Sequence, residues 1–171
     1  MSGKNKKTEL HIELVPKTCF YSNVRTLLPN KYWDQLRKES YEKAEHKCQI
    51  CGDTGKNQGY NHNVECHEIW DYNEDTRTQK LLGLVSLCPK CHQVKHFGRT
   101  SAIGKQPEAF KHMEKVNNWS HKDCVEHAAD SMMIWMDRSK YKWKLDLDIL
   151  NEKFDIPKKL ITEAHKKRLN G

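Results

Sequence analysis

The chain is organised around the sequence Leu87-Cys-Pro-Lys-Cys-His-Gln-Val-Lys-His96, in which an apolar run ends in a CxxC pair and two histidines. A second pair, Cys48-Gln-Ile-Cys51, lies upstream. Two such pairs offer four thiolates, the ligand set that closes tetrahedrally around zinc in structural sites. We therefore expect one structural zinc ion, bound by Cys48, Cys51, Cys88 and Cys91.

Other states of these cysteines are two free pairs, a redox-active CxxC or an iron–sulfur cluster. The chain has seven cysteines, and four of them in CxxC pairs favour metal thiolates over disulfides in a reducing compartment. Of the remaining three, Cys19 and Cys124 are best explained as small buried apolar side chains. Cys66 lies in the segment considered below.

The insertion between the two pairs must itself be structured, because Cys51 and Cys88 are 37 positions apart and zinc ribbons usually separate their pairs by roughly 15 to 20 residues. Residues 64–72 and 79–87 are apolar runs typical of two paired strands, separated by a polar turn at 71–75. Pro89 suits the first turn of a helix that continues through His96. The expected core is strand, strand, helix.

Periodicity and turn residues predict the elements that flank this core. They are a short strand at 10–15, an amphipathic helix at 30–46, a Gly-containing connector at 97–106, helices at 108–116 and 120–138, a short strand at 143–149 and a basic helix from Pro157 to about Leu169.

The helix at 120–138 opens with Ser120 and Asp123, a variant of the capping box. Its Val, Ala, Met and Trp side chains form a broad apolar face, which we expect to be buried as core.

The chain should form one α+β unit, a small zinc-stabilised ββα-metal core flanked by α-helices. Its 171 residues leave room for a single modest core. The expected parts are a basic disordered tail at 1–9, a strand and helix at 10–47, the metal-binding core at 48–98 and a helical region at 107–171.

The charge favours a polyanionic partner, with nucleic acid the first candidate. The formal net charge is +7, the sequence pI is about 9.0 and the mean hydropathy is −0.94. Each Lys or Arg that neutralises a phosphate releases condensed counterions, although a lysine-rich surface also serves solubility alone.

The sequence has no feature of a membrane protein. It has no run of about 20 apolar residues, and no apolar segment of a signal peptide follows its start. We expect a soluble cytoplasmic protein that does not bind membranes, whose oligomeric state the sequence does not fix.

Three histidines outside the CxxC pairs predict a second metal site. His92 and His96 are four residues apart on one face of the expected helix, and His67 lies on the preceding hairpin. Three imidazoles with an open coordination position are what a catalytic metal requires. Any one histidine taken singly is more often structural or exposed, so the prediction depends on the spacing of all three.

The order CxxC, His-containing strand, apolar run and CxxCHxxxH resembles the HNH endonucleases, whose core is the ββα-metal fold. The resemblance covers about residues 48–98, and residues 87–96 are its most specific part. It implies cleavage of DNA phosphodiester bonds with a general base and one catalytic divalent metal, which would be Zn, Ni, Mn or Mg. The matching metal positions are His67, His92 and His96.

The sequence departs from the family pattern at two places. In the register that keeps Ile69 apolar, His67 is the ligand and Glu68 occupies the position of the usual general-base histidine. A shifted register makes Cys66 the ligand and His67 the base, and strand alternation alone cannot choose between them. A glycine, Gly83, lies where the family usually has its middle asparagine.

We therefore expect a metal-dependent HNH-type endonuclease acting on DNA, with Glu68, His67 and His92 carrying the reaction. Glu68 is a candidate base, and a solvated strand carboxylate explains it equally well. The alternative function is a noncatalytic, zinc-stabilised nucleic-acid-binding module with a degraded nuclease site. A zinc deaminase does not fit, because its signature needs His-x-Glu and Pro-Cys-x-x-Cys.

Overall fold

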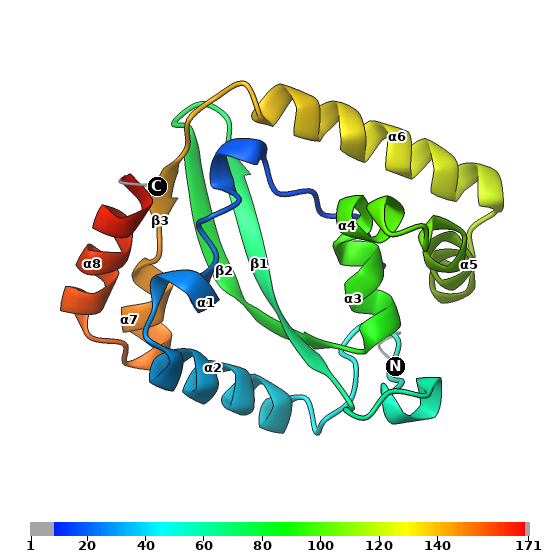
Figure 1. Cartoon of the computed structure of the whole chain (residues 1–171), viewed down its shortest axis with the longest axis horizontal. Coiled ribbons are helices and arrows are strands. Elements are labelled where there is room, and N and C mark those ends of the chain that lie inside the picture. The colour runs from blue at the N-terminus through cyan, green and yellow to red at the C-terminus, as the bar shows by residue number, and fades with distance from the viewer. Residues whose placement is uncertain (1–8, 170–171) are drawn as a thin grey trace, which may run out of the picture.

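The strands form one mixed sheet, and helices surround it in an α+β arrangement (Figure 1). β1 (Glu65–Asn73) pairs antiparallel with β2 (Thr78–Leu87), and β2 pairs in parallel with the short β3 (Lys144–Asp146). The computed structural model describes residues 9–169. The expected basic tail at 1–9 lies outside this range except for Glu9, which is exposed.

Eight α-helices and two short 3-10 turns, Lys17–Cys19 and Lys56–Gln58, complete the described part of the chain. The helices are α1 (Val24–Leu27), α2 (Asn30–Lys43), α3 (Pro89–Lys95), α4 (Phe97–Ala102), α5 (Gln106–Asn117), α6 (His121–Arg138), α7 (Asp148–Phe154) and α8 (Lys158–Leu169).

The core order β1, β2, α3 follows the prediction. β1 and β2 form a long twisted hairpin (Figure 1). Helix α3 starts directly after β2, at the end of the hairpin opposite its turn. The register places His67 opposite Val85 and Ile69 opposite Gly83, and an irregularity follows between Ile69 and Trp70. β1 extends through Asn73, so the tight turn lies beyond the start of the polar segment predicted at 71–75.

Two hydrophobic clusters lie on either side of this hairpin. One joins the four CxxC cysteines to α3, α5 and the N-terminal segment, and it includes Leu10, Ile12 and Met113. The other joins α1, α2, α7 and α8 to β2 through residues such as Leu36 and Leu81. The sheet is therefore held by packing on one side and by packing plus the cysteine cluster on the other.

Two of the predicted flanking elements are wrong. Residues 10–15 are extended but do not pair as a strand, because their N–H groups find other partners: Leu10 N–H donates to Asn117 Oδ1 at 2.8 Å and Ile12 N–H to His127 Nε2 at 2.9 Å. The connector expected at 97–106 contains helix α4, despite its glycine.

The prediction that the apolar face of α6 is core is also wrong. The capping box is present, with Ser120 Oγ accepting from Asp123 N–H, but only Cys124 in this helix is buried. The helix packs on α5 at its start and on the N-terminal segment further along, so much of its apolar surface has no neighbour among residues 9–169. The exposed side chains are Val125, Met132, Met133, Ile134 and Met136.

None of the helices between residues 9 and 169 combines the length and apolar character that a bilayer crossing needs.

Candidate metal centres

The four CxxC cysteines are brought together by two turns. Gly52 follows Cys51 with a φ of +76°, which glycine adopts at low cost, and its N–H donates to the Cys48 carbonyl at 2.8 Å. Cys88 is the N-cap of α3, and Pro89 occupies the first helical turn as predicted. These two turns of the backbone thus bring the sulfur atoms of both CxxC pairs together.

The cysteine cluster has the dimensions of a tetrahedral zinc site. All four sulfur atoms lie within 4.8 Å of one another, and Cys51 Sγ lies 3.6 Å from Cys88 Sγ. Four thiolates about 2.3 Å from zinc would lie roughly 3.8 Å apart. Three of the cysteines are buried and Cys51 is half-buried, so the cluster suggests a structural zinc.

Crowding shifts the pKa values of these thiols in opposite directions. Hydrogen bonding from Cys51 lowers the pKa of Cys48 to about 6, and the neighbouring thiols also lower the pKa of Cys88. The same contacts raise the pKa of Cys51 and Cys91. A divalent cation would remove this conflict, because it favours the thiolate form of every ligand.

The three predicted histidines also converge. Ligand nitrogens of His67, His92 and His96 lie within 4.8 Å of one another. The Nε2 atoms of His92 and His96 are 3.0 Å apart, and the ring centroid of His67 lies 5.3 and 5.0 Å from those of His92 and His96. His67 comes from β1, whereas the other two come from α3 and its end. This group could hold a second metal.

Two carboxylates engage the other nitrogens of this cluster. Glu65 Oε2 bonds His92 Nδ1, and Glu13 Oε2 lies 3.0 Å from His67 Nε2. His67 Nδ1 is then a buried atom with no hydrogen-bond partner in residues 9–169. A histidine that binds a metal usually donates its second ring N–H to a carboxylate or carbonyl. The donor set therefore fits a cation bound by three imidazoles.

The environment of His67 and His96 favours their neutral form, which is the form that binds a metal. Burial, together with the proximity of His92 and His67, lowers the pKa of His96 to about 3. Burial also lowers the pKa of His67. For Glu13, burial opposes ionisation, but hydrogen bonding from His67 and the charge of Lys95 bring its pKa down to about 2.

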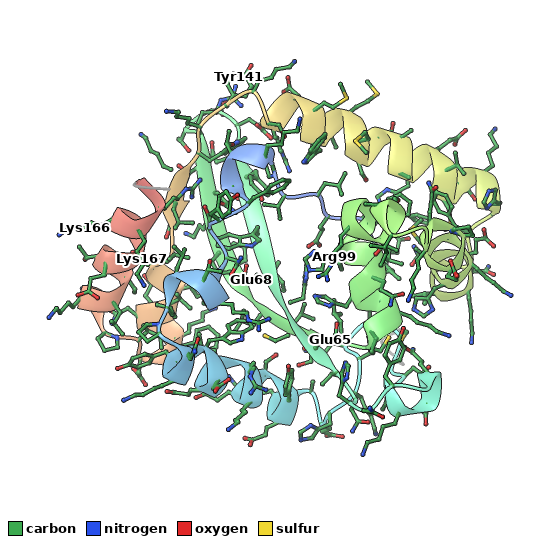
Figure 2. The ribbon with its side chains drawn as sticks, viewed as in Figure 1. Glu65, Glu68, Arg99, Tyr141, Lys166 and Lys167 are labelled. Carbon is green, nitrogen blue, oxygen red and sulfur yellow. The ribbon has the colours of Figure 1, made fainter. Side chains whose placement is uncertain are left out.

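Glu68 does not join the imidazoles. Successive residues of a strand face opposite sides, and the Glu68 carboxylate accepts from Val24 N–H at 2.6 Å and from Trp70 Nε1 at 3.1 Å. In Figure 2 Glu68 lies on the side of β1 toward α1, whereas Glu65 lies further down the strand toward α3. Burial raises the pKa of Glu68 to about 7.

The placement of β1 bears on the two registers. His67, and not Cys66, is grouped with His92 and His96. Cys66 faces α2 instead, near Ser40, and burial raises the pKa of its thiol to about 12. Gly83, which pairs with Ile69, brings no polar side chain to this part of the hairpin.

A large groove borders the histidines. It has a volume of about 1110 Å³ and runs between β1, the N-terminal segment, α1, α3, α4 and α6. His67, His92, His96 and Glu68 all line it, as do the exposed Arg25 and Arg99. Figure 2 shows Arg99 on the α4 side, across from Glu68. The groove therefore borders both the imidazoles and the strand carboxylate.

Sequence reasoning missed Glu13, Glu65 and Lys95. A signal existed for Glu65, which lies two residues before His67 and so on the same face of the strand. No local pattern marks Glu13, because it meets His67 from 54 positions away. Lys95 is buried beside it and forms an ion pair with Glu13.

No family model, no curated protein and no solved structure matches this chain.

Proposed function

We propose that the chain is a metal-dependent HNH-type endonuclease that hydrolyses phosphodiester bonds in DNA. The observation that carries the proposal is the convergence of His67, His92 and His96 on one side of a hairpin–helix unit. The cysteine cluster at the start of α3 supports it, since this helix delivers two of the three histidines.

The three imidazoles would hold one divalent cation with an open coordination position. When bound, such a cation stabilises the charge that develops on the phosphate and the leaving oxygen. Arg25 and Arg99, on the walls of the groove, supply positive charge for the phosphate backbone. Glu68 is the candidate general base for the attacking water.

A second function, noncatalytic nucleic-acid binding, is favoured by the environment of Glu68. Both of its carboxylate oxygens already accept hydrogen bonds, from Val24 and Trp70. A carboxylate held in this way anchors the start of α1 and does not have to act as a base. In that case the protein binds DNA with a strong salt dependence and cleaves nothing.

Plasmid digestion with a panel of divalent ions tests the first function. We expect nicking or cleavage that needs an added divalent ion and that His67→Ala and His92→Ala each abolish. Glu68→Gln should lower the rate by about 10²- to 10⁴-fold if the carboxylate is the base. Full activity of this variant would assign Glu68 to the structural role.

A matched control is His121→Ala, which removes an exposed imidazole that pairs with Glu114 and contacts the ring of Phe110. This variant should cleave like the wild type, and circular dichroism should show all variants folded. Salt-dependent DNA binding without cleavage under any ion would favour the second function.

A further inference from the structure

We propose that Glu13 is a positioning residue that holds His67 with its Nδ1 atom toward the metal. This role rests on the proposed second metal site and extends it beyond the hairpin–helix unit, because Glu13 belongs to the N-terminal segment. That segment reaches the site from outside residues 48–98.

The contacts of Glu13 tie two parts of the site together. One carboxylate oxygen lies 3.0 Å from His67 Nε2, and the other pairs with the buried Lys95 of α3. The ammonium of Lys95 thus fixes the carboxylate on the helix that also carries His92. The carboxylate in turn selects the tautomer of His67 that carries its proton on Nε2.

The N-terminal segment is itself held at several points. Asn117 accepts from Leu10 N–H and donates to the Leu10 carbonyl, at 2.8 and 2.9 Å. Glu13 N–H donates to the Lys95 carbonyl at 3.3 Å. Leu10 and Ile12 are buried in the same cluster as the cysteines. A side chain fixed in this way can orient a ring with little loss of conformational entropy.

The contact between Glu13 and His67 Nε2 leaves the other ring nitrogen, His67 Nδ1, available for a metal. With Nε2 engaged, the lone pair of His67 is on Nδ1, a buried atom without a partner among the described residues. Leaving a buried polar atom unsatisfied costs free energy, which metal binding would recover. Glu65 acts on His92 in the same manner through Nδ1. Glu13 itself is not among the mutually close ligand atoms.

Titration of the zinc-loaded full-length protein with Ni²⁺ tests this role. Isothermal calorimetry should show one Ni²⁺ site in the wild type and an affinity about 10- to 100-fold weaker in Glu13→Ala. Glu13→Gln keeps an oxygen acceptor for Nε2–H, so most of the affinity should return. Long-range ¹H–¹⁵N spectra should show His67 protonated on Nε2 in the wild type.

The matched control is Glu9→Ala, which removes an exposed carboxylate of the same segment that, within residues 9–169, pairs with His11. It should bind Ni²⁺ like the wild type. Glu13→Ala alone leaves the buried Lys95 ammonium without its partner. The double variant Glu13→Ala with Lys95→Met removes the carboxylate and this charge together, and it should bind Ni²⁺ as weakly as Glu13→Ala.

Wild-type affinity in folded Glu13→Ala and in the double variant would overturn the role of Glu13 while leaving the metal site intact. A wild type that binds no Ni²⁺ would instead overturn the second metal site, and the positioning role with it.

Discussion

At the scale of residues, the hydrogen-bond partner of each ring nitrogen determines which nitrogens of the histidine cluster are left for a metal. His92 and His67 each have one nitrogen bonded to a carboxylate, and the other remains for a cation. His96 bonds to no carboxylate within the described residues, and its pKa is lowered to about 3 by burial and by the two neighbouring rings.

A histidine outside the cluster predicts a pH dependence of stability. His127 Nε2 accepts from Ile12 N–H at 2.9 Å, and burial lowers its pKa below the usual 6.5. His11 and Lys95 oppose protonation of His127, while Asp130 and Glu9 favour it. Its contribution to stability is therefore complete above pH 6.5 and is lost as the pH falls toward the folded-state pKa.

Replacing this imidazole with a non-titrating acceptor should remove that dependence. We expect the melting temperature of the wild type to fall more steeply than that of His127→Gln between pH 7 and pH 5. Thermal unfolding at a series of pH values measures the difference in melting temperature between the two proteins. The other histidines are present in both proteins, so their effects on the melting temperature cancel in this difference. Parallel curves for the two proteins would show that the Ile12 contact does not sense His127 protonation.

At the scale of elements, the loop after the first CxxC pair is packed against the start of α3. A Cβ atom at Gly55 would lie 2.1 Å from the His62 carbonyl oxygen and 2.9 Å from Pro89 Cδ. Only glycine fits between this backbone and the proline ring. The loop and the helix therefore fix each other, which places Cys88 and Cys91 opposite Cys48 and Cys51.

Gly55→Ala should destabilise the fold by about 2–3 kcal/mol, because such overpacking displaces the loop or α3. Gly98→Ala in α4 is the control, since its Cβ would meet only Leu14 Cδ2, at 3.6 Å. Removing a helical glycine should be neutral or stabilising by up to about 1 kcal/mol. Urea unfolding of both variants checks this, and equal stabilities would contradict the packing argument.

At the scale of the whole molecule, the parts that could be predicted from sequence are those set by local spacing. The hairpin, α3 and the two ligand sets follow from CxxC pairs, an i and i+4 histidine pair and strand alternation. The N-terminal segment could not be predicted, because Leu10 and Ile12 show strand alternation but bond to side chains of α5 and α6. The exposure of Met133 on α6 could not be predicted either. Helical periodicity identifies an apolar face, but it does not show whether another element packs on that face.

Helix α3 connects the two candidate metal sites, because the cysteines lie at its start and the histidines lie toward its end. Cys88 and Cys91 are in its first turn, whereas His92 and His96 follow toward its end. A zinc ion in the cysteine cluster would hold this helix against the loop at residues 48–55. Removing that zinc should therefore unfold the region that presents the histidines, while removing a metal from the histidines should leave the fold intact.

The metal content per chain shows whether the three imidazoles hold a cation. After mild chelation and reloading with Ni²⁺ or Mn²⁺, mass spectrometry of the purified protein should find one retained zinc and one exchangeable ion. A variant with His67→Ala and His92→Ala should keep the zinc and lose the exchangeable ion. One metal per chain in both proteins would contradict the account, because the three imidazoles would then hold no cation.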